Sequence, residues 1–203
     1  MWYFADPMCS WCWGFSPVID AIKSTFGEKL PIVLNLGGLR PGTTVALASE
    51  TRQEILHHWH AVQQTSGQDF TFEGALPVGF IYNTEPASRA VVVLGEIDAT
   101  LTLEYFKVIQ KAFYLDQVDV TQIDQLSSLA QGYGVDRQQF NDLYHTDEII
   151  QKTQAHFYRT QQFGVRGFPT LILHYNERYF PLSNGYQSFE VLEPKIRTIL
   201  LSL

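Results

Sequence analysis

Two cysteines separated by two residues are the side chains of this chain best suited to chemistry. The only cysteines present are Cys9 and Cys12, which enclose the pair Ser10-Trp11. At this spacing the two thiols can form a disulfide with each other or stay reduced. One thiolate can attack a disulfide, and the second can then resolve the mixed disulfide that results. The spacing therefore predicts thiol–disulfide exchange.

A strand before this pair and a helix after it would place Cys9 at a helix N-terminus. Residues 2–5 are apolar and aromatic, which is typical of a short buried strand. From about Cys9 to Phe26, apolar residues recur at helical spacing. Unpaired backbone N–H groups and the positive end of the helix dipole favour a thiolate in the first turn. We therefore expect Cys9 to attack and Cys12 to resolve.

A second motif lies far along the chain, where residues 164–170 read Gly-Val-Arg-Gly-Phe-Pro-Thr. A bond that precedes proline adopts the cis form at a cost of only about 0.5–1 kcal/mol. We expect a cis bond between Phe168 and Pro169 at the start of a strand. If that strand pairs beside residues 2–5, Pro169 faces Cys9. The backbone of Phe168 would then offer hydrogen bonds to an extended peptide.

Three further side chains lie close to these motifs in sequence. Trp11 would cover one side of the sulfur and contact the substrate. Asp6 either caps the helix start or disfavours the thiolate through its charge. Arg166 would offset that charge if the proline loop folds over the site. Trp11, Arg166 and Phe168 are the predicted substrate-binding residues.

The predicted elements form one α/β layer that is interrupted in sequence by helices. Residues 31–36 predict a second strand, which closes a right-handed βαβ unit. From residue 44 to residue 163 the sequence shows helix signals and almost no strand signals. The helices predicted there cover residues 50–64, 86–97, 101–114, 121–131, 136–144 and 147–163. Residues 170–175 and 179–182 predict a hairpin, and residues 188–203 a final helix.

Two prolines fall inside the predicted helices. Proline cannot donate a backbone hydrogen bond, and its ring clashes with the preceding turn. We expect Pro17 to kink the first helix or to mark where its regular part begins. We expect the final helix to begin near Pro194 or to bend there.

Composition excludes several classes of function. The formal net charge of −7 argues against a nucleic-acid partner, since binding phosphates requires a basic face. No apolar run approaches the roughly 20 residues of a membrane span. The N-terminus lacks the features of a secretory signal, so we expect a cytoplasmic protein. Whether a signal was removed before Met1 stays open. In the cytoplasm a C-x-x-C pair is more often catalytic or metal-binding than structural.

Other patterns favour structural explanations. A structural zinc site needs four ligands, and the chain has no second C-x-x-C, so we predict no metal site. His57 and His60 share a helix face with His58 beside them, but solvated histidines explain this cluster better than a metal does. Residues 37–42 are rich in glycine and predict a turn. Four aromatic residues fit the core of the helical segment better than a substrate groove: Phe70, Phe72, Phe80 and Tyr82.

Residues 6–15, Asp-Pro-Met-Cys-Ser-Trp-Cys-Trp-Gly-Phe, together with residues 164–170, resemble the DsbA-like branch of the thioredoxin superfamily. Within it the chain is most similar to the FrnE-like, predicted cytosolic disulfide isomerases. The resemblance implies a thioredoxin fold with an all-helical domain inserted between the second and third strands. The thioredoxin-like domain would comprise residues 1–43 and 164–203, and the insertion residues 44–163. Cys9 would attack, Cys12 resolve, and Pro169 be the cis-proline beside them.

The same resemblance implies a thiol–disulfide oxidoreductase that acts as a reductase or isomerase. Its partners would be protein or peptide thiols and disulfides, without a cofactor and with glutathione left open as a co-substrate. DsbA has a proline and a histidine where this chain has Ser10-Trp11, which argues against strong oxidase activity. Kappa-class glutathione transferases and chromene-carboxylate isomerases have a serine in place of Cys9. Their glutathione-dependent chemistry is the alternative enzymatic function, and a redox-sensing protein adapter is the non-enzymatic one.

Overall fold

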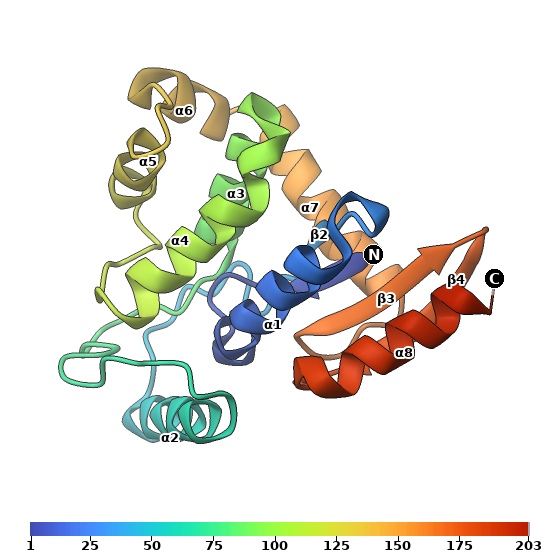
Figure 1. The fold of residues 1–203 in the computed structure, drawn as a ribbon. Helices are drawn as coiled ribbons and strands as arrows, with labels where there is room; N and C mark the ends of the chain where they lie inside the picture. The colour runs from blue at the N-terminus through green and yellow to red at the C-terminus, as the bar shows by residue number, and fades with distance from the viewer. Residues whose placement is uncertain (203) are drawn as a thin grey trace.

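A four-stranded sheet with helices on both faces forms the centre of the molecule in the computed structural model, which describes residues 1–202 (Figure 1). The strands are β1 (Trp2–Ala5), β2 (Val33–Leu36), β3 (Thr170–Tyr175) and β4 (Arg178–Asn184). Their order in the sheet is β2-β1-β3-β4. β1 pairs parallel to β2 and antiparallel to β3, which pairs antiparallel to β4. The first and last thirds of the sequence thus build one sheet.

Eight α-helices surround this sheet in residues 1–202. They are α1 (Ser10–Phe26), α2 (Ser49–Ser66), α3 (Glu85–Ile97), α4 (Thr102–Tyr114), α5 (Ile123–Gln131), α6 (Arg137–Tyr144), α7 (Asp147–Gln162) and α8 (Phe189–Leu201). Two 3₁₀ turns, η1 (Gly27–Lys29) and η2 (Ala99–Leu101), were not predicted. Helices α2 to α7 lie between β2 and β3 in the sequence, as expected for the inserted helical segment. In this part of the chain no helix combines the length and the apolar character that a membrane crossing requires.

β1 is covered on both of its faces. Its side chains alternate between the two faces of the sheet, as in any strand. Tyr3 packs against Phe15 of α1, with ring centroids 6.0 Å apart. Trp2 and Phe4 point to the opposite face and pack on Phe163, which follows α7, at 4.6 and 5.5 Å. Burial from both sides explains why residues 2–5 are apolar without alternation.

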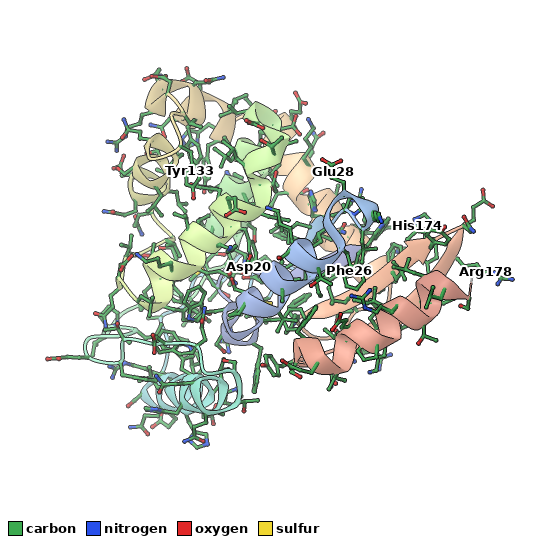
Figure 2. All side chains as sticks on the ribbon, in the orientation of Figure 1. Asp20, Phe26, Glu28, Tyr133, His174 and Arg178 are labelled. Carbon is green, nitrogen blue, oxygen red and sulfur yellow. The ribbon has the colours of Figure 1, made fainter. Side chains whose placement is uncertain are left out.

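The helical insert packs directly on α1. A Cβ atom on Gly14 would lie 2.6 Å from Cγ1 of Val62 and 2.9 Å from Oγ of Ser66, both on α2. Only glycine therefore permits this close approach of the two helices. On the exposed side of α1, Lys107 of α4 donates to Asp20 at 2.8 Å. Asp20 is labelled in Figure 2, on the side of α1 that faces α4.

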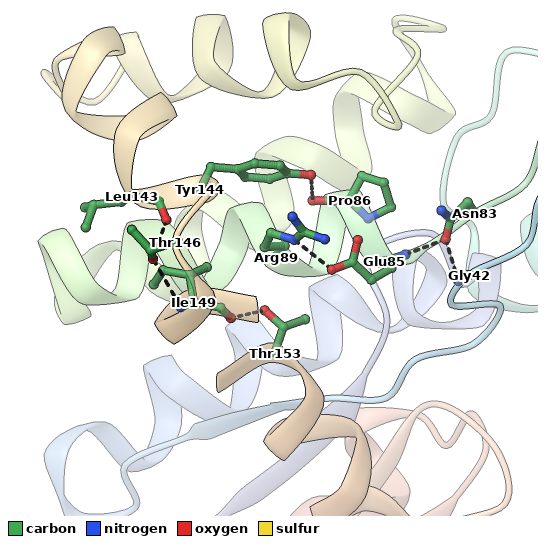
Figure 3. A network of polar contacts seen from close by, with 10 residues as sticks. All are labelled: Gly42, Asn83, Glu85, Pro86, Arg89, Leu143, Tyr144, Thr146, Ile149 and Thr153. Atoms are coloured by element: carbon green, nitrogen blue, oxygen red, sulfur yellow. Dashed lines mark hydrogen bonds and ion pairs between the residues drawn. The ribbon is translucent and has the colours of Figure 1, made fainter. Parts of the chain in front are cut away.

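A polar network fixes the start of α3 relative to the sheet (Figure 3). Arg89 Nε donates to Glu85 Oε1 at 2.7 Å, and the guanidinium lies 4.8 Å from the centroid of the Tyr144 ring on α6. Asn83 Oδ1 accepts hydrogen bonds from the backbone N–H groups of both Glu85 and Gly42. Because Gly42 belongs to the loop after β2, this asparagine joins that loop to the insert.

The aromatic residues between α2 and α3 lie in the core of the insert, as predicted. Phe70, Phe80 and Tyr82 are buried and Phe72 is half-buried. Phe70 and Phe72 pack on the fully buried Trp59 of α2, with ring centroids 5.5 and 6.4 Å from it. Phe80 and Tyr82 stack on Phe113 of α4. These side chains stabilise the insert and form no open groove.

Both prolines lie inside their helices. Pro17 is exposed and lies well inside α1, so it does not mark the start of the helix. Of the two alternatives for the last helix, a start near Pro194 is wrong, because α8 begins at Phe189, one residue after the predicted Ser188. A bend at Pro194 stays a prediction. The Ser188 carbonyl accepts the N–H groups of residues 191 and 192 and thereby starts the helix earlier. Other predicted boundaries agree with the structure within two residues, apart from Leu203, which lies outside the described residues.

Candidate active site

The two cysteines lie where β1 gives way to α1. Cys9 is the N-cap residue of α1, and its carbonyl accepts the N–H groups of Cys12 and Trp13 at 3.0 and 3.1 Å. Within residues 1–202 no side chain caps this end of the helix. The positive end of the helix dipole is therefore left facing the first cysteine, as the sequence predicted.

The two thiols differ in accessibility. Cys9 keeps 6% of its surface exposed, whereas Cys12 is fully buried, and neither is in a disulfide. Burial raises the pKa of the Cys12 thiol well above its usual value, and a hydrogen bond to Cys9 and the charge on Cys9 raise it further. Cys12 thus stays protonated at neutral pH, and Cys9 is the more accessible of the two sulfurs.

The proline loop lies against the first cysteine. The peptide bond between Phe168 and Pro169 is cis, as predicted. The Cys9 thiol donates to the Phe168 carbonyl, with a sulfur–oxygen distance of 3.7 Å. Pairing of β1 with β3, which places Phe4 opposite Thr170, brings these distant segments together. The predicted juxtaposition of the cysteine pair and the proline loop is confirmed.

The glycine-rich turn after β2 receives the side chain of Phe168. A Cβ atom on the buried Gly37 would overlap the Phe168 ring, and one on Gly38 would lie 2.8 Å from the ring of Phe157 in α7. The turn predicted at residues 37–42 is present, and its first glycines are required by this close packing. With its ring held there, Phe168 keeps its backbone on the side of Cys9.

Asp6 does not cap α1, so that prediction is wrong. Its carboxylate is fully buried and accepts the N–H of Met8 through Oδ1 at 2.9 Å and the N–H of Leu39 through Oδ2 at 2.7 Å. Burial raises the pKa of Asp6 to about 6, although the hydrogen bonds from Leu39, Met8 and Thr84 act in the opposite direction. Asp6 therefore ties the turn before Cys9 to the turn after β2.

Arg166 does not offset the charge of Asp6. The arginine is exposed, and within residues 1–202 it forms no ion pair, whereas Asp6 has no exposed surface. Arg166 instead lines a surface pocket of about 330 Å³ together with Thr170 and Asn184. Because the loop carries Arg166 outward, its part in substrate binding remains a prediction.

Trp11, between the two cysteines in the sequence, packs against Tyr186. Its ring is half-exposed and lies 6.0 Å from the ring of Tyr186, which precedes α8. Tyr186 in turn contacts Phe15 of α1 at 6.0 Å. Tyr186 was not among the predicted residues, since nothing in its local sequence distinguishes it. The contact of Trp11 with a substrate remains a prediction.

A residue of the helical insert forms a hydrogen bond with the turn before Cys9. The Tyr82 hydroxyl donates to the Met8 carbonyl at 2.5 Å, and burial raises the pKa of this tyrosine. The N–H of Arg40 donates to Oγ1 of the buried Thr84 at 3.1 Å. Tyr82 was expected in the core, and this contact could not be predicted from the local sequence, because its partner lies 74 positions away.

The histidines of α2 form no metal site. His57 and His58 are exposed, and His60 stacks on Phe72 with ring centroids 3.8 Å apart. Among residues 1–202 no three histidine, cysteine, aspartate or glutamate side chains are arranged to hold a metal ion. The stacking on Phe72 gives His60 a packing role.

Solved structures share this fold over its whole length. The crystal structure of a candidate protein disulfide isomerase from Nitrosomonas europaea is 43% identical, with a TM-score of 0.93 over 99% of this chain and 97% of that one. The cytosolic disulfide reductase DsbM from Pseudomonas aeruginosa is 24% identical, with a TM-score of 0.80 over 100% and 98% of the two chains. These likenesses confirm the thioredoxin fold with a helical insertion.

Curated relatives are more distant. The ClpXP adapter protein SpxH from Halalkalibacterium halodurans is 22% identical over 175 residues, which is 83% of this chain and 56% of that protein. The chain thus spans little more than half the length of these relatives. The profile of the DSBA-like thioredoxin domain matches residues 2–197. The chain belongs to the DSBA-like thioredoxin domain family.

Proposed function

We propose that this protein is a disulfide reductase or isomerase that works through Cys9 and Cys12. The asymmetry of the two thiols carries this proposal. Cys9 retains exposed surface at the start of α1, and Cys12 is buried beside it with a raised pKa. The carbonyl of Phe168 and the cis Pro169 lie opposite, where an extended peptide can bind.

In the proposed reaction, the Cys9 thiolate attacks one sulfur of a substrate disulfide. The other substrate sulfur leaves as a thiolate and takes a proton from water. Cys12 then loses its proton and attacks the Cys9 sulfur, which releases the second substrate thiol. The substrate gains two electrons, and the protein is left with a Cys9–Cys12 disulfide. Isomerisation instead requires a second substrate thiol to attack the mixed disulfide, which restores Cys9 without a net change of oxidation state.

We propose glutathione as the thiol that reduces the Cys9–Cys12 disulfide. Two glutathione molecules supply the two electrons and leave as glutathione disulfide. The similar DsbM protein is described as a cytosolic disulfide reductase and was also solved with GSH. On the same ground we propose the cytoplasm as the compartment and protein or peptide disulfides as the substrates.

Insulin reduction tests this proposal. In the presence of dithiothreitol the wild-type protein is expected to accelerate precipitation of the insulin B chain. Cys9→Ser should abolish the acceleration, because no nucleophile remains. Cys12→Ser should slow turnover, and in a separate incubation without dithiothreitol it should accumulate a mixed disulfide at Cys9, which mass spectrometry detects and added reductant removes. Ser10→Ala, which keeps both thiols, is the matched control. Equal activity of wild type and Cys9→Ser would contradict the proposal.

A non-enzymatic adapter is the second candidate, because the curated relatives are ClpXP adapter proteins. The same assay separates the two functions. An adapter would show no turnover in the wild type even though the Cys9 thiol reacts with an alkylating reagent. A third function, glutathione-dependent isomerisation of a small molecule, would proceed without Cys12. Turnover by Cys12→Ser with such a substrate would favour it over disulfide exchange.

A further inference from the structure

A cavity of about 720 Å³ lies at the far end of α1 from the two cysteines. α1 has 17 residues and so separates the two places by about 25 Å. Lys23 and Gly27, near the C-terminal end of α1, line the cavity, as does Glu28 in the turn that follows. Figure 2 labels Phe26 and Glu28 at this end of the helix. The cavity is therefore separate from the candidate active site.

The walls of this cavity are mostly apolar. They come from β2 and the segment before it, from α3 and from the start of α4. The apolar wall residues include Leu30, Ile32, Leu34, Val91, Val92 and Leu103. Cavities of roughly 300–1,000 Å³ with apolar walls and a few polar groups are the usual form of small-molecule sites.

One polar surface of the cavity is the free edge of β2. In a parallel pair, alternate residues of a strand form hydrogen bonds with the neighbouring strand. Here the N–H groups of Val33 and Gly37 donate to β1, and the backbone of Leu36, between them, points away from β1. The outward N–H and carbonyl of Leu36 are satisfied by His156 and Thr160 of α7, at 3.3 and 3.1 Å. α7 thus closes the edge at Leu36 and leaves the cavity beside the preceding residues.

His156 supplies the second polar group. Its Nδ1 accepts the N–H of Leu36, so the ring proton is on Nε2. Burial, aided by the charge of Arg159, lowers the pKa of His156 to about 4, so the ring is neutral at physiological pH. His156 lines the cavity, and no hydrogen-bond acceptor for its Nε2–H exists among residues 1–202. One residue of the cavity wall therefore carries a neutral N–H donor that has no partner within residues 1–202.

The charges at the cavity rim disfavour an anion. Lys23 is paired with Glu104 at 3.0 Å, and Glu96 is paired with Lys152 at 2.6 Å. No cation of residues 1–202 forms an ion pair with Glu28. The one rim charge without a partner is thus negative, and it stands over an apolar interior.

We propose that this cavity binds a small neutral molecule with an apolar body and a carbonyl oxygen that accepts the Nε2–H of His156. The apolar walls bury the body, and the imidazole fixes its orientation. This site needs neither cysteine and makes no use of the proposed disulfide chemistry.

Two probes of similar shape test the proposal, namely naphthalene and 2-acetylnaphthalene. Binding is followed by two-dimensional NMR of the ¹⁵N-labelled full chain, with backbone amides of residues 32–36 and 91–95 as reporters. We expect saturable shifts of these amides with both probes. Without a hydrogen bond, the ratio of the two affinities should equal the ratio of the water–octanol partition coefficients of the two probes. One hydrogen bond to the ketone should raise the affinity ratio about three- to tenfold above that value, in favour of 2-acetylnaphthalene.

Variants then locate the donor and the cavity. His156→Phe should lower the affinity ratio to the ratio of the partition coefficients of the two probes. His58→Phe, the same change on an exposed face of α2, is the control and should leave the affinity ratio as in wild type. Val92→Phe should fill the cavity and abolish binding of both probes. If Val92→Phe does not fold, Thr100→Phe at the exposed rim serves the same purpose. Insulin reduction should be unchanged in Val92→Phe or Thr100→Phe.

Three results would overturn the proposal. The first is the absence of saturable shifts at residues 32–36 and 91–95 with either probe. The second is an equal preference for the ketone in wild type and His156→Phe. The third is undiminished binding in both cavity-filling variants. None of these results depends on whether the cysteines exchange disulfides.

Discussion

Asp6 is the residue whose chemistry is least expected from its place in the sequence. Its carboxylate is fully buried, and what stabilises it is the set of backbone N–H groups of Met8 and Leu39. These hydrogen bonds recover only part of the hydration that a carboxylate has in water. The pKa of Asp6 accordingly rises from 3.8 to about 6.

This shift predicts a pH-dependent stability. The folded protein holds the Asp6 proton up to about pH 6, whereas the unfolded chain releases it near 3.8. The contribution of Asp6 is therefore full below pH 3.8 and is lost as pH rises to about 6. Relative to Asp6→Asn, the free energy of unfolding of the wild type should fall by about 3 kcal/mol across this range.

Urea unfolding of both proteins between pH 3.5 and 7.5 measures this difference. The variant also loses one hydrogen-bond acceptor, but that loss is constant with pH and leaves the slope unaffected. A difference that does not change with pH would show that the Asp6 pKa is not raised.

Gly37 is a second residue with a sharp requirement, because a Cβ there would overlap the Phe168 ring. Gly37→Ala should lower the free energy of unfolding by about 1–3 kcal/mol and slow insulin reduction, since the proline loop must shift. Adding Phe168→Ala removes the overlapping ring. In a double-mutant cycle by urea unfolding, the double variant should therefore lose less stability than the two single losses sum to. Additive losses would contradict the contact.

At the residue scale, functional residues could be predicted from the sequence where neighbouring residues form a recognisable motif. Cys9, Cys12 and the cis Pro169 could be predicted because their types and spacing are meaningful locally. Asp6 and Gly37 could not, because their partners Leu39 and Phe168 come from other parts of the chain. A glycine in a turn and an acid near a helix start each have a simpler local explanation.

At the scale of elements, the pattern of apolar residues predicted every α-helix and strand of residues 1–202, because each has a face on a common core, but not the two short 3₁₀ turns. The errors concern the ends. Of the two alternatives at Pro194, a later start of α8 was wrong: proline is usually excluded from the inside of a helix, yet α8 runs through Pro194, which lies on the exposed face. Contacts of Leu192 and Ile196 with the core outweigh the missing hydrogen bond there.

Pro194 therefore lowers the stability of α8. Pro194→Ala would restore the missing N–H and relieve the clash with the preceding turn, without changing a buried contact. We expect the free energy of unfolding to rise by about 1–3 kcal/mol and the melting temperature to rise with it. Lys195→Ala, at the exposed neighbour, should change stability little. Calorimetry compares both with wild type, and a lower melting temperature for Pro194→Ala would contradict the prediction.

At the scale of the whole molecule, packing contacts and hydrogen bonds connect the predicted insertion to the predicted thioredoxin-like domain. Gly14 of α1 packs on Val62 of α2, and Tyr82 holds the carbonyl of Met8. The division into residues 1–43 with 164–203 and residues 44–163 remains a prediction of sequence order. These contacts lead us to expect one cooperative unfolding transition.

Tryptophans at both places measure this cooperativity. Trp2 lies on the sheet and Trp59 in the insert. We consider two variants, each of which keeps only Trp2 or only Trp59 and has the other tryptophans changed to phenylalanine. In each variant, the urea midpoint measured by fluorescence should equal the midpoint measured by far-ultraviolet circular dichroism. A fluorescence transition of Trp59 that is separated from the circular dichroism transition would show that the insert unfolds independently.

The pairing of β1 with β3 also has a consequence for biosynthesis. Cys9 is made early, yet the Phe168 carbonyl against which it rests comes 159 positions later. At about 5–20 residues per second, a ribosome needs roughly 8–30 s to cover that interval. During this time the nascent chain carries two thiols with no proline loop over them. The contact between Cys9 and the Phe168 carbonyl can therefore form only after residue 168 has been added to the chain and has left the ribosome.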